Sequence, residues 1–237
     1  MPDRTHPVDI AELERVTQLR AAQNKAVELF HQVELRGLIR PGILESQLNQ
    51  EIYDLARDLF GITTYWHKRI VRAGRNTLAP YDENPPDLTL QPDDILFLDL
   101  GPVFEEYEAD FGRTFVLGSD PARLKLQSDI AQAFADGKAH FHATPGITAA
   151  QLFQHCVHLA HHYGWEFGGP IAGHLIGHFP HERIPKDKIS LYIHPDNPLP
   201  LRSLSPDGSP RHWILEIHFV DPARQIGGFY EELLTID

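Results

Sequence analysis

The sequence predicts an α/β domain made of two similar halves, each with two helices followed by strands. Two segments with apolar residues at helical spacing are followed by short apolar runs typical of buried strands, and this order occurs twice. A Pro-Gly-Ile sequence separates the two helical segments of each half, at Pro41 and at Pro145. Duplicated helix–helix–strand units would form an α/β domain with a site between its halves.

The first half begins with two amphipathic segments. Apolar residues at roughly helical spacing predict a long helix over 8–35. A second helix is predicted over 46–60, with Gly61 at its carboxyl end. The segment 65–71 has strand-like composition, and 79–88 is predicted to be a loop because it is rich in proline and polar residues.

Residues 95–117 are predicted to form an antiparallel hairpin, with apolar runs at both ends and turn residues between them. Asp99 and Asp110 lie eleven residues apart in this stretch. A carboxylate within a buried strand is costly unless it is paired or binds a metal ion. The alternative, that one aspartate caps a turn and the other binds Arg113, is equally open from this segment alone.

The second half repeats the order of the first. Asp120-Pro121 predicts a helix start, because proline is favoured at the first helical position. The predicted segments that follow are helices over 124–143 and 148–163, a surface loop over 195–210, and strands over 213–220 and 228–236.

Three further places in the second half match the two aspartates in chemical type. His174 lies in a glycine-flanked segment, Gly-His-Leu-Ile-Gly-His. Glu216 lies in an apolar strand and points away from its apolar neighbours, because side chains alternate along a strand. The pair Glu231 and Glu232 also lies in strand-like sequence. Each feature alone is typical of a polar surface residue, but together they favour a site in which divalent cations neutralise several carboxylates.

Composition narrows the classes of function. The chain has 237 residues and a formal net charge of -12, which disfavours binding to nucleic acid or to anionic membranes. Cys156 is the one cysteine, so an internal disulfide framework is excluded, which fits a reducing compartment. The sequence has no apolar signal core or membrane-length apolar run, and we expect a cytoplasmic protein that does not contact membranes.

The ordered set of acidic and imidazole residues resembles the pita-bread metallopeptidase superfamily, which includes methionine aminopeptidases, aminopeptidase P, prolidase and creatinase. The segments DLGPVFEEYEADFGRTFVLG and GHLIGHFPHE resemble its first metal motif and its histidine motif. The resemblance implies a pita-bread fold, with two pseudo-symmetric halves of helices and antiparallel sheet around a dinuclear metal site. It implies one catalytic domain over 1–237, without the N-terminal domain of creatinase-type relatives.

The resemblance also implies roles for individual residues. Asp110 and Glu231 would bridge two ions, with Glu232 as the rival of Glu231. Glu216 would act as a general base as well as a ligand, and His181 would hold substrate or stabilise the oxyanion. The ions would be Mn²⁺, Co²⁺, Fe²⁺ or Zn²⁺. The five implied metal ligands are Asp99, Asp110, His174, Glu216 and Glu231.

The residues expected to contact substrate depart from the family pattern. Tyr81 and Asp82 stand near the position where the aminopeptidases carry another histidine. We therefore consider His67, His178, His218 and Tyr81 as candidates for a different set of substrate contacts.

The resemblance implies a hydrolase that cleaves a peptide-like or other amide C–N bond of a small substrate with a metal-bridged water. The enzymatic alternative is a relative with non-peptide chemistry, such as a creatinase-like hydrolase or a lyase. The non-enzymatic alternative is a binding module of the same fold. A homodimer is compatible with the sequence, although no residue requires one.

Overall fold

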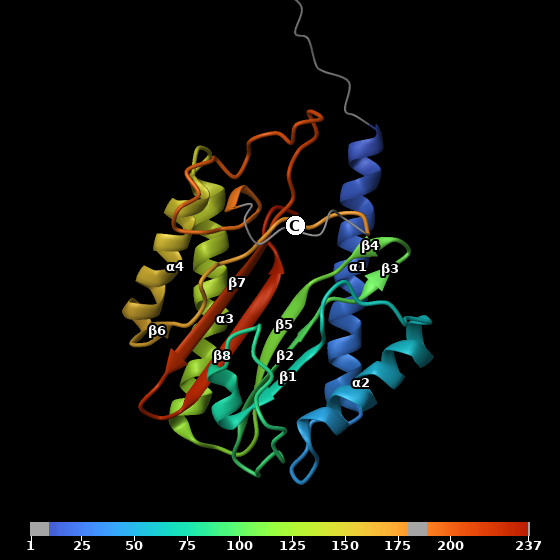
Figure 1. Ribbon diagram of the computed structural model, residues 1–237, viewed down its shortest axis with the longest axis vertical. Coiled ribbons are helices and arrows are strands. Elements are labelled where there is room, and N and C mark those ends of the chain that lie inside the picture. Colours follow the sequence, from blue (N-terminus) through green and yellow to red (C-terminus); the bar gives the residue numbers. More distant parts are fainter. Residues whose placement is uncertain (1–9, 180–188, 237) are drawn as a thin grey trace, which may run out of the picture.

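The computed structural model describes residues 10–179 and 189–236 (Figure 1). Within these residues, six antiparallel strands form one sheet in the order β1-β2-β5-β8-β7-β6, and β3 and β4 form a separate two-stranded ribbon. The elements are α1 (Ile10–Leu35), α2 (Glu45–Phe60), β1 (Ile70–Ala73), the 3-10 helix η1 (Gly74–Leu78), β2 (Ile95–Leu100), β3 (Val103–Phe104), β4 (Tyr107–Glu108), β5 (Phe111–Val116), α3 (Pro121–Ala143), α4 (Ala149–Tyr163), β6 (Glu166–Phe167), the 3-10 helix η2 (Ile189–Leu191), β7 (Ile214–Asp221) and β8 (Ile226–Leu233).

Local sequence signals explain where the helices begin and end. The Asp120 side chain accepts hydrogen bonds from two backbone N–H groups at the start of α3, directly before the proline at its first position. Thr148 and Gln151 form a capping box at the start of α4. Gly61 and Gly164 end α2 and α4 in the left-handed conformation that glycine adopts without strain. The predicted helices are confirmed, except that residues 8 and 9 lie outside the described residues.

The helices cover one face of the sheet in two groups, one for each half (Figure 1). Leu96, Leu98 and Leu100 of β2 pack in one buried cluster with α1 and α2. Leu215 and Ile217 of β7 pack in another with α3 and α4. Side chains alternate along a strand, so the intervening residues of these strands point to the opposite face.

The two halves of the sheet meet at β5 and β8, where Gly112 lies opposite Glu231 in the described register. Two residues further along β5, the side chain of Thr114 takes the place of backbone hydrogen bonds between β5 and β8. Its hydroxyl donates to the carbonyl of Phe229 at 2.9 Å and accepts from the N–H of the same residue at 2.7 Å. We call this junction the seam. The buried hydroxyl satisfies a backbone donor and an acceptor that would otherwise lack partners.

The hairpin predicted over 95–117 is present, with β2 and β5 paired antiparallel and the β3–β4 ribbon inserted between them. Glu105 and Glu106 form its turn in the left-handed region, with φ of 48° and 74°. The strand predicted over 65–71 was placed too early, because β1 begins at Ile70. The preceding residues are held instead by contacts with the start of the ribbon, including a bridge between Tyr65 and Pro102.

None of the helices in the described residues combines the length and the apolar character that crossing a bilayer requires.

Candidate metal centre

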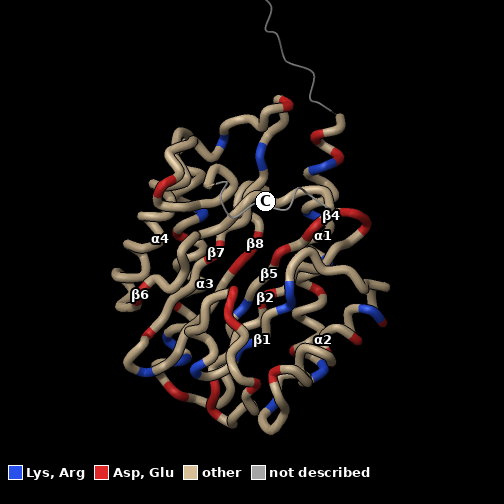
Figure 2. Tube along the Cα trace, viewed as in Figure 1, with Lys and Arg blue, Asp and Glu red and all other residues tan. Residues whose placement is uncertain are grey.

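Three carboxylates and one glycine form a row across the four central strands, on the face that the helices leave uncovered. Asp99 of β2 lies opposite Gly112 of β5, Gly112 lies opposite Glu231 of β8, and Glu231 lies opposite Glu216 of β7. Residues directly opposite each other in an antiparallel sheet project to the same face. The register therefore brings Asp99, Glu216 and Glu231 together, although they are far apart in the sequence. Figure 2 shows acidic segments on these central strands.

Gly112 makes room for this row. A Cβ atom at this position would lie 2.5 Å from Cδ1 of Phe229 and 3.1 Å from Cβ of Glu231. Both distances are shorter than ordinary contacts between carbon atoms. A larger residue would therefore displace Glu231 from its place in the row.

Asp110 and His174 approach the row from segments outside the sheet. Asp110 directly precedes β5 and is buried. Nε2 of His174 lies 3.1 Å from Oδ2 of Asp110, and its Nδ1–H donates to the carbonyl of Leu175 at 2.8 Å. The preceding Gly173 has φ of 135° and lies against the backbone of β7, so close that a Cβ atom would overlap the carbonyl of Ile214.

Burial of so many charged groups shifts their proton affinities. Burial raises the pKa of Asp99 to about 6 and the pKa of Glu216 to about 7, and the charge of Asp110 adds to both shifts. Burial and the neighbouring carboxylates also raise the pKa of Glu231 well above its ordinary value. Burial alone would raise the pKa of Asp110, but the neighbouring imidazoles lower it to about 2. The metal-free site is thus electrostatically costly.

The residues present fit a divalent cation. Glu231 is 2% exposed, and its Oε2 atom has no hydrogen-bond partner among the described residues. Within residues 10–179 and 189–236, two groups have ligand atoms that all lie within 4.8 Å of one another, and both contain Asp110. A cation would neutralise these carboxylates and satisfy the orphaned oxygen. The groups are His67, Asp99 and Asp110, and Asp110, His174 and Glu231.

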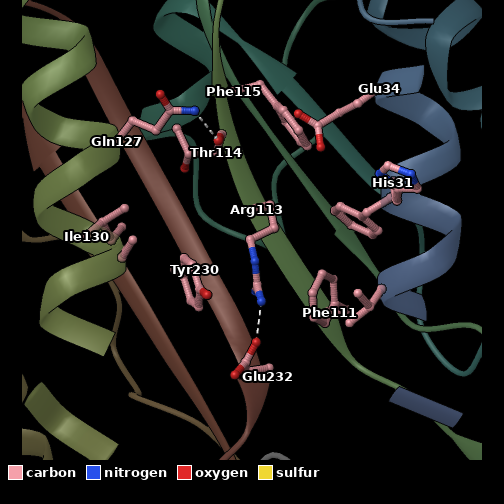
Figure 3. A pocket seen from close by; sticks show the side chains of 13 residues that line it. His31, Glu34, Phe111, Arg113, Thr114, Phe115, Gln127, Ile130, Tyr230 and Glu232 are labelled. Carbon is pink, nitrogen blue, oxygen red and sulfur yellow. Dashed lines mark hydrogen bonds and ion pairs between the residues drawn. The ribbon is translucent and has the colours of Figure 1, made fainter. Parts of the chain in front are cut away.

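The geometry also separates Glu231 from its rival Glu232. Glu232 projects to the helix-covered face, where it forms an ion pair with Arg113 between α1 and α3 (Figure 3). The guanidinium lies between the rings of Phe111 and Tyr230, at 3.8 and 3.7 Å from their centroids. These residues line a hollow of about 550 Å³ on that face. Of the two glutamates, Glu231 is therefore the one that faces the carboxylate row.

Comparison with known proteins identifies the family. The sequence signature of metallopeptidase family M24 matches residues 17–203. The chain belongs to metallopeptidase family M24. The predicted superfamily is therefore confirmed. The structure is similar to a prolidase from Thermococcus sibiricus, with a TM-score of 0.72 and 20% identity over 97% of this chain and 60% of that one. It is also similar to an X-Pro aminopeptidase from Thermotoga maritima, with a TM-score of 0.71 and 20% identity over 97% of this chain and 62% of that one. These similarities confirm the predicted pita-bread fold.

Curated relatives of this M24 chain include Xaa-Pro dipeptidases. The one from Lactobacillus delbrueckii subsp. lactis is 28% identical over 137 residues, which are 58% of this chain and 36% of the relative. The one from Pyrococcus horikoshii is 31% identical over 109 residues, which are 46% of this chain and 30% of the relative. The matched regions thus span about a third of the curated relatives.

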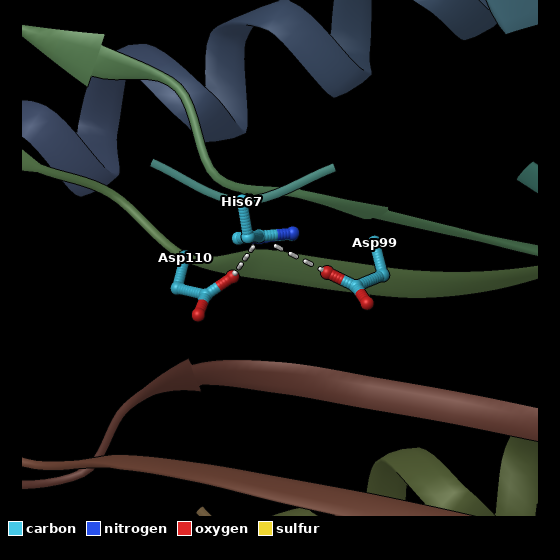
Figure 4. Close-up of side chains that lie close together, drawn as sticks. All are labelled: His67, Asp99 and Asp110. Carbon is cyan, nitrogen blue, oxygen red and sulfur yellow. Dashed lines mark hydrogen bonds and ion pairs between the residues drawn. The ribbon is translucent and has the colours of Figure 1, made fainter. Parts of the chain in front are cut away.

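The residues that we considered for substrate contacts are placed differently in the M24 chain. His67 is buried against the cluster, 3.2 Å from Asp110 and 3.5 Å from Asp99 (Figure 4). The Tyr81 ring lies 6.1 Å from the His67 ring and is half exposed. Nε2–H of His218 donates to the carbonyl of Thr77 at 2.9 Å, and its ring packs against two phenylalanines.

His178 and His181 are the two candidate histidines still to be placed. His178 is exposed and lies 3.5 Å from Glu106 of the ribbon turn. His181 lies outside the described residues, so its assigned role stays a prediction.

Two residues near the cluster were missed by the sequence analysis. The Trp66 ring lies between two imidazoles, at 4.5 Å from His67 and 5.0 Å from His174. Arg72 is buried in β1 and donates to backbone carbonyls of the loop that carries Tyr81. The available signals were a Trp-His pair directly before a strand and a charged residue inside the apolar strand IVRA.

Proposed function

We propose that this chain is a metal-dependent hydrolase that holds two divalent ions and cleaves a C–N bond in a small peptide-like substrate. The observation that supports this most is the convergence of Asp99, Glu216 and Glu231 from three separate strands. The buried Oε2 atom of Glu231 has no partner among the described residues. A structural ion-pair network would place a cationic side chain there, whereas an orphaned buried carboxylate oxygen is costly.

The proposed ligands are the five that the resemblance implied. Asp110 takes part in both groups of closely spaced ligand atoms, and this supports its assignment as a bridge between two ions. Glu231 lies directly opposite Glu216 in the register of β7 and β8. When bound, two divalent ions would provide an activated water and polarise the scissile carbonyl. The ligand set of oxygens and imidazole suits Mn²⁺, Co²⁺, Fe²⁺ or Zn²⁺.

The protein's own residues would divide the remaining work. Glu216 is half-buried at the end of the row, whereas Asp110 and Glu231 are fully buried. Glu216 is therefore the carboxylate that can take a proton from an attacking water and still reach the substrate. The ring of Trp66 packs against the His174 imidazole and holds its orientation. His181 remains our sequence-based candidate for the group that stabilises the oxyanion.

The proposed substrates are short peptides, with Xaa-Pro dipeptides first among them. This rests on the Xaa-Pro dipeptidases among the relatives and on the X-Pro aminopeptidase among the similar structures. The enzymatic alternative, hydrolysis or elimination of a non-peptide amide, is favoured by one observation. Tyr81 and Asp82 stand where we expected the family aminopeptidases to carry a histidine, so the groups that bind substrate differ.

The test pairs metal content with hydrolysis. Purified protein is stripped with a chelator, reloaded with each candidate metal, and assayed for bound metal and for cleavage of Xaa-Pro dipeptides, Met-initiated peptides and small amides. Glu231→Gln should lose tight metal binding and hydrolysis together. Glu232→Gln is the matched control, because this neighbour faces the other side of the sheet, and it should keep both. A wild-type protein that holds no divalent ion would contradict the proposal.

A further inference from the structure

His67 and His174 are held in the same way in the two halves of the chain. In each, the Nδ1–H of the ring donates to the carbonyl of the following residue, at 2.7 Å for Lys68 and 2.8 Å for Leu175. A histidine whose Nδ1 carries the proton presents the Nε2 lone pair as a metal ligand. Such outer hydrogen bonds commonly orient metal-binding imidazoles.

Both rings direct Nε2 at the same carboxylate, one at each oxygen. Nε2 of His67 lies 3.2 Å from Oδ1 of Asp110, and Nε2 of His174 lies 3.1 Å from Oδ2. A carboxylate that bridges two ions binds one through each oxygen. The two imidazoles therefore lie where they could bind one ion each, on opposite sides of Asp110.

The surroundings of His67 are shaped for its approach to the cluster. Its side chain is 8% exposed, and Nε2 also lies 3.5 Å from Oδ1 of Asp99. Gly101 follows β2 beneath the ring, and a Cβ atom there would overlap both His67 and Trp66. The absence of a side chain at position 101 allows the imidazole of His67 to approach Asp99 and Asp110.

The internal repeat of the sequence relates the two histidines. Each half has a helix after its Pro-Gly-Ile sequence, a glycine that ends this helix, then a histidine, and then two acids on or directly before a pair of antiparallel strands. The first half supplies His67 with Asp99 and Asp110. The second half supplies His174 with Glu216 and Glu231. His67 lies before β1 and His174 lies after β6, so each half supplies one imidazole from the segment between its second helix and its two acids.

We propose that His67 is a metal ligand, so that each of the two ions binds one imidazole and the centre has six protein ligands. This rests on the proposed dinuclear site and changes the role of His67 from the substrate contact considered in the sequence analysis. The three residues His67, Asp99 and Asp110 would surround one ion, while His174 and Glu231 would complete the other with Asp110. A second imidazole makes the site softer and favours Co²⁺, Fe²⁺ or Zn²⁺ over Mn²⁺.

The experiment counts bound imidazoles directly. In Co²⁺-loaded protein, each histidine bound through Nε2 gives one strongly shifted, solvent-exchangeable Nδ1–H proton signal in the NMR spectrum. The wild type should give two such signals, and His67→Gln should give one. By calorimetry, His67→Gln should bind the second ion at least about tenfold more weakly, since even outer-shell changes cost about 10–100-fold in metal affinity. His178→Asn changes an exposed histidine whose Nε2 lies beside Glu106; it is the control and should give two signals.

The outcomes separate this inference from the proposed function. One signal from wild type that holds two ions would overturn the role of His67 and leave the hydrolase proposal standing. Two signals that persist in His67→Gln would do the same. Wild type that binds no ion would overturn both. Should His67→Gln fail to fold, the signal count from wild type labelled with ¹⁵N-histidine still decides between one imidazole and two.

Discussion

Replacement of Thr114 by valine should weaken the seam between the two halves of the sheet. The substitution keeps the branched shape of the side chain and removes the hydroxyl. That hydroxyl is buried and binds both the N–H and the carbonyl of Phe229. Each buried backbone group left without a partner costs about 1–3 kcal/mol, so loss of both partners in Thr114→Val should lower the free energy of unfolding by about 2–6 kcal/mol. This is a large share of the roughly 5–15 kcal/mol typical of folded proteins.

The assay is urea denaturation followed by tryptophan fluorescence and by far-ultraviolet circular dichroism, with agreement between the two transitions as the test of two-state unfolding. A chelator is present throughout, because ions that bind only the folded protein would add to its stability. Thr17→Val is the control, since the Thr17 hydroxyl is exposed and donates to the carbonyl of the preceding helical turn. It should change stability by less than about 0.5 kcal/mol. A Thr114→Val protein as stable as this control would refute the reasoning.

Three further predictions concern the site and one helix start. Gly112→Ala should destabilise the fold by about 1–3 kcal/mol, because the added Cβ meets Phe229, and calorimetry should also find weaker metal binding, because it meets Glu231. Burial raises the pKa of Glu216 from 4.5 to about 7, so the stability that its protonation contributes is present below pH 4.5 and lost as pH rises to about 7. In urea titrations with chelator, the free energy of unfolding of Glu216→Gln relative to wild type should therefore be higher at pH 8 than at pH 5. An equal difference at the two pH values would count against this. Thr148→Ala should lose about 1 kcal/mol in the same assay, because it removes the cap of α4, and an unchanged transition would show that the capping box is dispensable.

The helices could be predicted closely because their ends are encoded locally. Asp120 with its following proline, Thr148 with Gln151, and Gly61 each satisfy or terminate a helix through neighbours within a few residues. The strand at 65–71 was misplaced because the start of β1 depends on its long-range pairing with β2, where Ile70 lies opposite Asp99. Local composition carries no information about such pairings.

The site shows the same division between local and long-range information. Alternation along the strand indicated that Glu216 points away from its apolar neighbours, but it could not say which of Glu231 and Glu232 shares that face. That choice is made by the register with β7, which depends on the whole sheet. The approach of His67 to Asp110 was likewise invisible, since it depends on how an irregular segment packs over Gly101. The repeated Pro-Gly-Ile pattern was the available hint.

The candidate ligands stand on both sides of the seam, with Asp99 and Asp110 in the first half and Glu216 and Glu231 in the second. An ion bound by residues of both halves would link the two halves and their hydrophobic cores. Loss of the ion would leave repelling carboxylates at the seam between the two halves. Metal supply would then govern how long the protein survives proteases as well as whether it can act on a substrate.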